Sequence, residues 1–476
     1  MLPASVSRGY VREVLTRVSA GCVSTSPVQV TFGLLHERWR GLTVGLVLNV
    51  TFVAFEALAV ATIMPLVAED LGGIALYGWV FSSFLLADLV GIVLAGELAD
   101  RFGAALPFGA GLALFALGLL IGGLAPSMPV LVGARAIQGF GAGAIPAVAY
   151  VVIGRTYPDA LRPRMFAVLS TAWVVPGIAG PALAAFVADH FGWRSVFLGL
   201  LPLVIVAGSL ALRELRTVAG HPDREARRVF VDAVRVASGV GLALGGLQAR
   251  DVVFSPVLIA AGLVLAIPAL RNLLPPGTFR AKGALPAAVL SRGILTFAFF
   301  APDIFVPLTV TTIRGESVVL SGLALTAGTI AWTTGAWIQE RTVFRVGAAP
   351  LVRNGFLLIA VGIAGMGAVL AGAVPAWSCV PAWGIAGLGI GMAYSSISLT
   401  VLRHAPAGSE GATASSMQLA DILGNALGTG IGAVAVAAAV ASLGSAVAGV
   451  AITDALAGGL AVAGIFVASR LRPTTV

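Results

Sequence analysis

Residues 105–125 read ALPFGAGLALFALGLLIGGLA, an apolar run of 21 residues without a charged side chain. A helix needs about 20 predominantly apolar residues to cross the hydrocarbon core of a bilayer. Similar runs recur along most of the chain, which is 58% hydrophobic and only 11% charged. Since soluble domains carry about 25% charged residues, the sequence predicts an all-α integral membrane protein with many spans.

The apolar runs divide the chain into fourteen predicted spans. The seventh is the weakest of them, because Asp232 and Arg235 lie near its start. The spans are residues 42–64, 76–98, 105–125, 130–153, 165–187, 194–212, 230–249, 253–270, 291–312, 319–339, 351–373, 377–401, 412–439 and 447–469.

The distribution of basic residues provides a separate test of this number of spans. The net charge is +8, but the basic residues are spread through short loops, which argues against a nucleic-acid partner. With both termini in the cytoplasm, 24 of the 29 basic residues fall in cytoplasmic segments, and only Arg194, Arg250 and Arg314 fall outside. Arg135 and Arg235 lie within spans. This asymmetry follows the positive-inside rule and favours fourteen spans with both ends inside.

An internal repeat with an offset of 248 residues relates the two ends of the chain. It pairs Gly139, Gly141, Gly143, Arg155, Pro158 and Gly180 with Gly387, Gly389, Gly391, Arg403, Pro406 and Gly428. We therefore predict two six-helix bundles, residues 42–216 and 291–470, and a central segment, 217–290, with two extra spans. Parallel repeats of this kind place a substrate site between the halves, near the bilayer midplane.

The chain ends and the cysteines add little to this prediction. Residues 1–41 and 471–476 are expected to be cytoplasmic tails, and a short surface helix around Tyr10–Val18 is an alternative for part of the first. Cys22 and Cys379 are far apart and form no metal or redox motif.

Four motifs in the first half are more specific than the composition. Gly96-Glu-Leu-Ala-Asp100-Arg101-Phe-Gly103 joins spans two and three, and residues 131–141, LVGARAIQGFG, include Arg135 and Gln138. Span five contains Pro176-Gly177-Ile-Ala-Gly180-Pro181. Glu56 lies nine residues before Pro65 in span one.

In this order the motifs resemble those of the major facilitator superfamily, and in particular its fourteen-span drug:proton antiporters. The resemblance implies the major facilitator fold with the two extra spans between its bundles. It also implies conformational roles for Gly96, Asp100, Arg101, Gly103, Gly177, Gly180 and Pro181, and a proton-relay role for the region of Arg135. Two positions that are basic in the family's loop motif are Ala104 and Ala105 here.

Charged residues inside spans are candidates for function, because each costs about 2.5–3.5 kcal/mol at the bilayer centre on insertion scales. Glu56 lies near the middle of span one. Burial disfavours the charged form of a carboxylate, so Glu56 is a candidate for proton coupling. A permanent structural ion pair with Arg135 is the alternative. Gln138 lies one turn along the same helix face as Arg135.

Three further acids belong to this candidate set. Asp303 is one residue from the position that the repeat pairs with Glu56. Asp88 lies at mid-depth in span two and lines the cavity or faces a neighbouring helix. Asp421 forms a polar stripe with Gln418 and Asn425, which faces water or joins helices. The aromatic residues Tyr150, Trp173, Trp332, Trp337 and Tyr394 are weaker candidates, for substrate stacking or for packing.

These observations predict a proton-coupled secondary transporter that exports lipophilic drugs or similar compounds by alternating access. It would be a monomer in a bacterial-type cytoplasmic membrane, with protons, lipid and a small molecule as partners and no cofactor. No nucleotide-binding Gly-x-x-x-x-Gly-Lys-Ser/Thr loop occurs in the sequence. The alternatives are a transporter or importer of one lipid, peptide or metabolite, and an integral-membrane enzyme, which the lack of a metal-ligand cluster disfavours.

Overall fold

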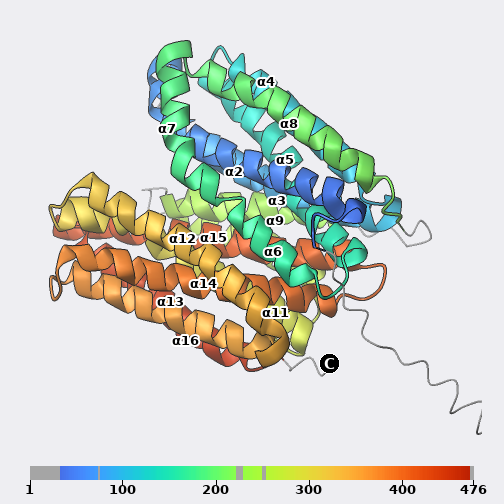
Figure 1. Ribbon diagram of the computed structural model, residues 1–476. Coiled ribbons are helices and arrows are strands. Elements are labelled where there is room, and N and C mark those ends of the chain that lie inside the picture. Colours follow the sequence, from blue (N-terminus) through green and yellow to red (C-terminus); the bar gives the residue numbers. More distant parts are fainter. Residues whose placement is uncertain (1–32, 73–75, 221–228, 249–253, 472–476) are drawn as a thin grey trace, which may run out of the picture.

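The computed structural model describes residues 33–72, 76–220, 229–248 and 254–471, and the regular structure in these ranges is helical. Within them, fourteen helical segments are long and apolar enough to cross a membrane, which confirms the predicted number of spans. The proposed surface helix at Tyr10–Val18 lies outside the described residues. Figure 1 shows two helix bundles that lie one above the other.

The upper bundle in Figure 1 contains the first six spans. Its helix α5 lies between α3 and α4. The glycines of α5 allow this packing, since a Cβ at Gly139 would meet the backbone of α3 and one at Gly141 the backbone of α4. The helices are α2 (Glu37–Leu71), α3 (Tyr77–Phe102), α4 (Ala105–Gly123), α5 (Met128–Thr156), α6 (Arg162–Thr171), α7 (Val174–Phe191) and α8 (Arg194–Leu215).

The lower bundle repeats this arrangement. Its helix α14 lies between α12 and α13, and the backbones of those helices occupy the space beside Gly387 and Gly389. The helices are α11 (Ala284–Asp303), α12 (Val318–Val346), α13 (Ala348–Leu370), α14 (Cys379–Arg403), α15 (Glu410–Leu443) and α16 (Val447–Ala468). Short helical turns occur at Thr278–Arg280 and Ala376–Ser378, and a π-helical turn at Leu308–Ile313.

The two extra spans, α9 (Val229–Gln248) and α10 (Phe254–Leu273), form a tight pair. Helix α9 packs against α3 of the upper bundle and also against α15 of the lower bundle. Asp232 accepts hydrogen bonds from Arg235 and Asn272, so the polar residues that weakened the prediction of this span are partners of one another.

Two spans differ from their predicted form. Span five is two helices, and the chain turns at Ala172 and Trp173 between α6 and α7. Span nine begins at Ala284, seven residues earlier than predicted, and its α-helix ends at Asp303 before Pro307. The backbone beyond Asp303 continues as a turn and then a π-helix, as expected for a kink near a proline.

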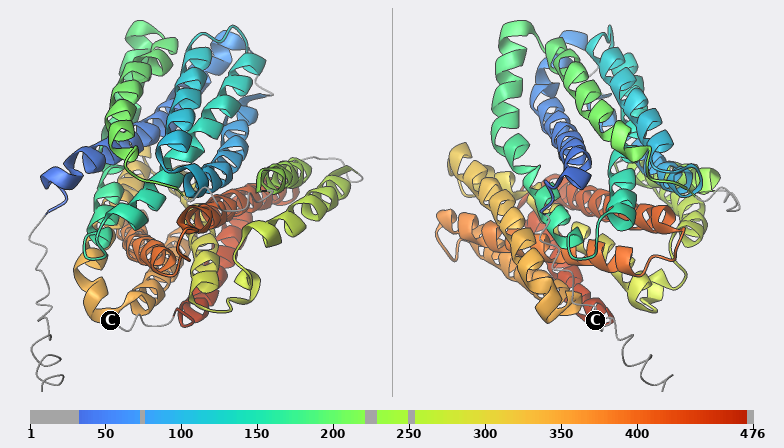
Figure 2. Two further views of the ribbon diagram at one scale, coloured as in Figure 1. Left: turned by 90° about the vertical axis from the view of Figure 1, so that its right-hand side faces the viewer. Right: turned by 45° about the vertical axis from the view of Figure 1, so that its right-hand side comes forward.

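The bundles are close together at one end and diverge at the other, as Figures 1 and 2 show. The described chain begins and ends at the end where they meet. The charge distribution predicts that this end faces the cytoplasm. We call it the closed end, and the site below is built around it.

Candidate functional site

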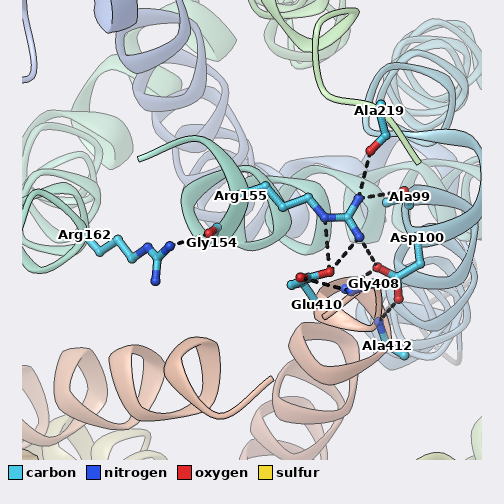
Figure 3. A network of polar contacts seen from close by, with 10 residues as sticks. Ala99, Asp100, Gly154, Arg155, Arg162, Ala219, Gly408, Glu410 and Ala412 are labelled. Atoms are coloured by element: carbon cyan, nitrogen blue, oxygen red, sulfur yellow. Dashed lines mark hydrogen bonds and ion pairs between the residues drawn. The ribbon is translucent and has the colours of Figure 1, made fainter. Parts of the chain in front are cut away.

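The closed end contains a network of charged groups that joins the halves (Figure 3). Asp100, at the end of α3, accepts hydrogen bonds from the backbone nitrogens of Gly411 and Ala412, at 2.7 and 2.9 Å. These are in the first turn of α15, where a helix presents free N–H groups and a partial positive charge. Arg155 of α5 donates to Asp100 at 2.7 Å and to Glu410 at 2.8 Å. We call Asp100, Arg155, Glu410 and the two nitrogens the closed-end network.

The residues of the predicted loop motif differ in their relation to this network. Gly96 is so close to α15 that a side chain there would meet Gly411 and Ser415. Gly103 ends α3 with a φ of 88°, which favours glycine. The Arg101 guanidinium, in contrast, lies 4.9 Å from the Phe102 ring and outside the network. Arg155 and Glu410 were not predicted as site residues, although the repeat includes Arg155.

Glu56 and Arg135 form an ion pair inside the upper bundle. Glu56 of α2 is fully buried, and the Nη1 of Arg135 on α5 donates to its Oε1. The same nitrogen donates to Gln138 at 2.6 Å, and the Phe84 ring lies 4.2 Å from the guanidinium. The second oxygen of Glu56 is buried without a hydrogen-bond partner. The structure therefore brings together the three residues that the sequence grouped, with one carboxylate oxygen left to accept a proton.

Asp303 has a corresponding place in the lower bundle. Its Oδ1 accepts a hydrogen bond from the indole nitrogen of Trp383 at 2.8 Å. Trp383 is 248 residues after Arg135, so the repeat pairs the two donors, and Asp303 lies one residue from the position that it pairs with Glu56. The donor for Asp303 is a neutral indole instead of a cation. The two acids lie in different bundles and do not contact each other.

A third group of polar residues lies at the interface of the halves. Arg292 of α11 is fully buried, and its Nε is 3.3 Å from Asp421 of α15. Its Nη2 donates to Tyr150 at 3.2 Å and to Ser398 at 3.0 Å. Tyr394 donates to Asp421 at 3.1 Å. We call Tyr150, Arg292, Tyr394, Ser398 and Asp421 the interface cluster.

The interface cluster corrects one sequence interpretation. Arg292 was counted with the cytoplasmic loops, but α11 begins at Ala284 and places Arg292 inside the span. Arg292 lies eight residues after the start of this helix, about 12 Å along its axis. Tyr150 and Tyr394, which the sequence offered for substrate stacking or packing, use their hydroxyl groups for hydrogen bonds within the cluster.

The remaining candidates are separate from one another. Gln418 is buried and its Oε1 has no hydrogen-bond partner, whereas Asn425 is half-buried. Asp88 is half-buried, lies against Gly143 of α5 and interacts electrostatically with Asp421. Trp173 is 45% exposed at the break in span five. Asp454 of α16, which the sequence reasoning missed, is a further buried acid.

The break in span five divides its contacts between the bundles. Helix α6 packs mainly against α12 and α14, whereas α7 packs mainly against α2 and α8. Gly180 faces Phe55 and Leu58 of α2, and Gly177 faces Thr329 of α12. Pro181 lies within α7. The glycine–proline motif therefore lies just after the point where the packing partners of span five change from the lower bundle to the upper one.

The described part of the chain holds two matching bundles of six spans and a pair of extra spans, with charges buried within and between the bundles. This is the architecture of a membrane transporter. The family model "Major Facilitator Superfamily" matches residues 44–429, so the chain belongs to this superfamily, as its motifs indicated. The protein is a transporter and not an enzyme.

Several known transporters resemble the chain at low sequence identity. The multidrug transporter protein MdtP of Bacillus subtilis is 26% identical over 67% of this chain, and that match spans 61% of MdtP. A "Probable multidrug-efflux transporter" of Mycobacterium tuberculosis is 27% identical over 84% of this chain and 88% of its own. Among solved structures, the human organic anion transporter MFSD10 matches with a TM-score of 0.67 at 14% identity, over 90% of this chain and 99% of that chain.

Proposed function

We propose that the protein exports lipophilic, drug-like compounds in exchange for protons by alternating access. The buried Glu56–Arg135 pair is the observation that carries this proposal. A buried ion pair is costly to break, because removal of one charge leaves the other uncompensated. Protonation of Glu56 would leave the buried charge of Arg135 uncompensated. Proton binding would therefore destabilise this conformation and favour another one in which Arg135 is not buried alone.

The relatives support export of drugs, since two of them are named for multidrug transport or efflux. The protein would reside in a bacterial cytoplasmic membrane as a monomer, with both termini in the cytoplasm. Residues 42–216 and 291–470 would be the two units that rock about a central site. In the conformation described here the closed-end network holds these units together on the cytoplasmic side.

The test is transport by the purified protein in liposomes with an imposed pH gradient. Substrate-driven proton flux is measured with tetraphenylphosphonium as a lipophilic cation, with a neutral lipophilic drug and with a fluorescent phospholipid. We expect flux for the drug-like probes, and we expect Glu56→Gln to abolish it, because the amide cannot bind the proton.

The matched control is Glu316→Gln, which removes an exposed carboxylate outside the candidate site. It should retain the flux of the unmodified protein. Undiminished flux in Glu56→Gln would remove the coupling role of this residue. Transport of the phospholipid alone would instead favour a dedicated lipid transporter, and accumulation along the proton gradient would favour an importer.

A further inference from the structure

The interface cluster connects an acid of one half to the other half through a single guanidinium. Asp421, Arg292, Tyr394 and Ser398 belong to the lower bundle, and Tyr150 is the only member from the upper one. Tyr150 and Ser398 are separated by the repeat offset of 248 residues, and their hydroxyl oxygens are 3.4 Å apart. Two residues that a repeat relates can touch only near the axis between the halves, so the cluster lies at their interface, close to that axis.

The cluster is deeper than the closed-end network. Tyr150 lies five residues before Arg155 on α5, which is about 8 Å along the helix. Asp421 lies eleven residues after Glu410 on α15, which is about 16 Å. The closed end therefore has two layers: the outer is the charge network, and the inner is the contact of Arg292 with Tyr150.

The position of Arg292 depends on the charge of Asp421. The guanidinium is fully buried, and its Nη1 and Nη2 donate to the Tyr394 carbonyl, Ser398 and Tyr150. These acceptors are uncharged, so Asp421 is the anion that compensates the buried cation. Asp421 also accepts the Tyr394 hydroxyl, which holds its carboxylate in place.

We propose that proton binding to Asp421 releases the inner layer, and that Arg292 is the positioning residue that transmits this change to Tyr150. The proposal rests on the proton coupling proposed above and assigns the acid that controls the closed end. With Asp421 neutral, the guanidinium has no counter-charge and moves toward water. Its hydrogen bond to the upper bundle is then lost, and the equilibrium shifts toward the open form although the closed-end network is unchanged.

Four titratable groups from the helices around Asp421 face it or its partner Arg292. They are Arg292 of α11, Tyr394 of α14, Tyr150 of α5 and Asp88 of α3. Asp88 is the other acid among them. The remaining acids of the candidate site, Glu56 and Asp303, bond to Arg135 and Trp383 in the bundle interiors.

The experiment measures the distance across the closed end as a function of pH. Spin labels are attached to cysteines at Ala160 and Ala407, exposed loop residues of the upper and lower bundle, with Cys22 and Cys379 replaced. Double electron–electron resonance is recorded in lipid nanodiscs without substrate. We expect the unmodified protein to move to longer distances as the pH falls. We expect Asp421→Asn to show the longer distances at every pH.

Two further variants separate this mechanism from simple destabilisation. Tyr150→Phe keeps all charges but removes the acceptor in the upper bundle, so it should show longer distances at neutral pH and a weaker response to pH. Asp454→Asn removes a buried acid of the same bundle outside the cluster and should keep the response of the unmodified protein. A normal pH response in folded Asp421→Asn or Tyr150→Phe, or its loss in Asp454→Asn, would overturn the proposal.

The same variants in the liposome assay distinguish this proposal from the proposed function. If Glu56→Gln abolishes proton flux but keeps the pH-dependent distance change, both proposals stand. If the unmodified protein transports in exchange for protons but its closed end does not respond to pH, the role of Asp421 fails and the proposed function remains. If the distance responds but no substrate drives proton flux, only the proposed function fails.

Discussion

Two buried guanidinium groups hold acidic side chains in this protein, and their surroundings differ. Arg135 pairs with Glu56 inside one bundle, with Phe84 beside it. Arg292 pairs with Asp421 at the interface, 3.2 Å from the ring centre of Tyr394. A change in the charge of the first pair therefore acts on packing within one half. A change in the charge of the second pair acts on the contact between the halves.

The Glu56–Arg135 pair leads to a prediction about stability. Arg135→Gln should lower the free energy of unfolding by about 3–5 kcal/mol, because it leaves a buried carboxylate without its partner. The double variant Glu56→Gln/Arg135→Gln should be more stable than Arg135→Gln, since no buried charge remains. Apparent melting temperatures in detergent would measure both. A double variant less stable than either single variant would contradict this account.

Sequence reasoning identified one of these two pairs, and the reason is physical. Glu56 and Arg135 lie well inside apolar runs, so a charge at either position stands out. Arg292 lies at the edge of its run, where hydropathy cannot separate a buried cation from a loop residue. Its partner Asp421 is far away in the sequence, and only the folded interface brings the two together.

At the scale of elements, the apolar runs predicted the number of spans but not the break in span five. The break at Trp173 has no charge or loop composition to mark it, and Pro176 follows it inside α7. The contacts explain it, because α6 and α7 pack mainly against different bundles. Such a break depends on tertiary packing, which a local pattern of hydropathy does not contain.

The extra helix pair leads to a prediction at this scale. The backbones of α9 and α10 touch at Gly239 and Gly262, so that a Cβ on Gly239 would lie 2.5 Å from the Gly262 carbonyl oxygen. Gly239→Val should lower the free energy of unfolding by about 1–3 kcal/mol through overpacking. The control is Gly245→Val on the same helix, where no atom lies within 4 Å of the added Cβ. Equal melting temperatures for the two variants would show that this contact does not stabilise the pair.

At the scale of the whole molecule, the halves share an apolar core, and the closed-end network adds charged contacts between them. Helix α9 contacts α3 of the upper bundle and α15 of the lower one, and α6 contacts α12 and α14 across the interface. Because charge-assisted hydrogen bonds contribute about 1.5–3 kcal/mol each, a change in one carboxylate is enough to shift the balance between closed and open forms.

The last prediction concerns this balance. Asp100→Asn weakens the bonds to Arg155 and to the first turn of α15, so the open population should rise about tenfold or more. A cysteine in place of Leu402, a buried residue of α14 that faces Gly154 of α5, should then react faster with a membrane-impermeant maleimide. Arg101→Gln, at the next position of the same motif, should leave this rate unchanged, because Arg101 lies outside the network. If both variants accelerate labelling equally, the motif acts as a unit and the bonds of Asp100 do not by themselves hold the halves together.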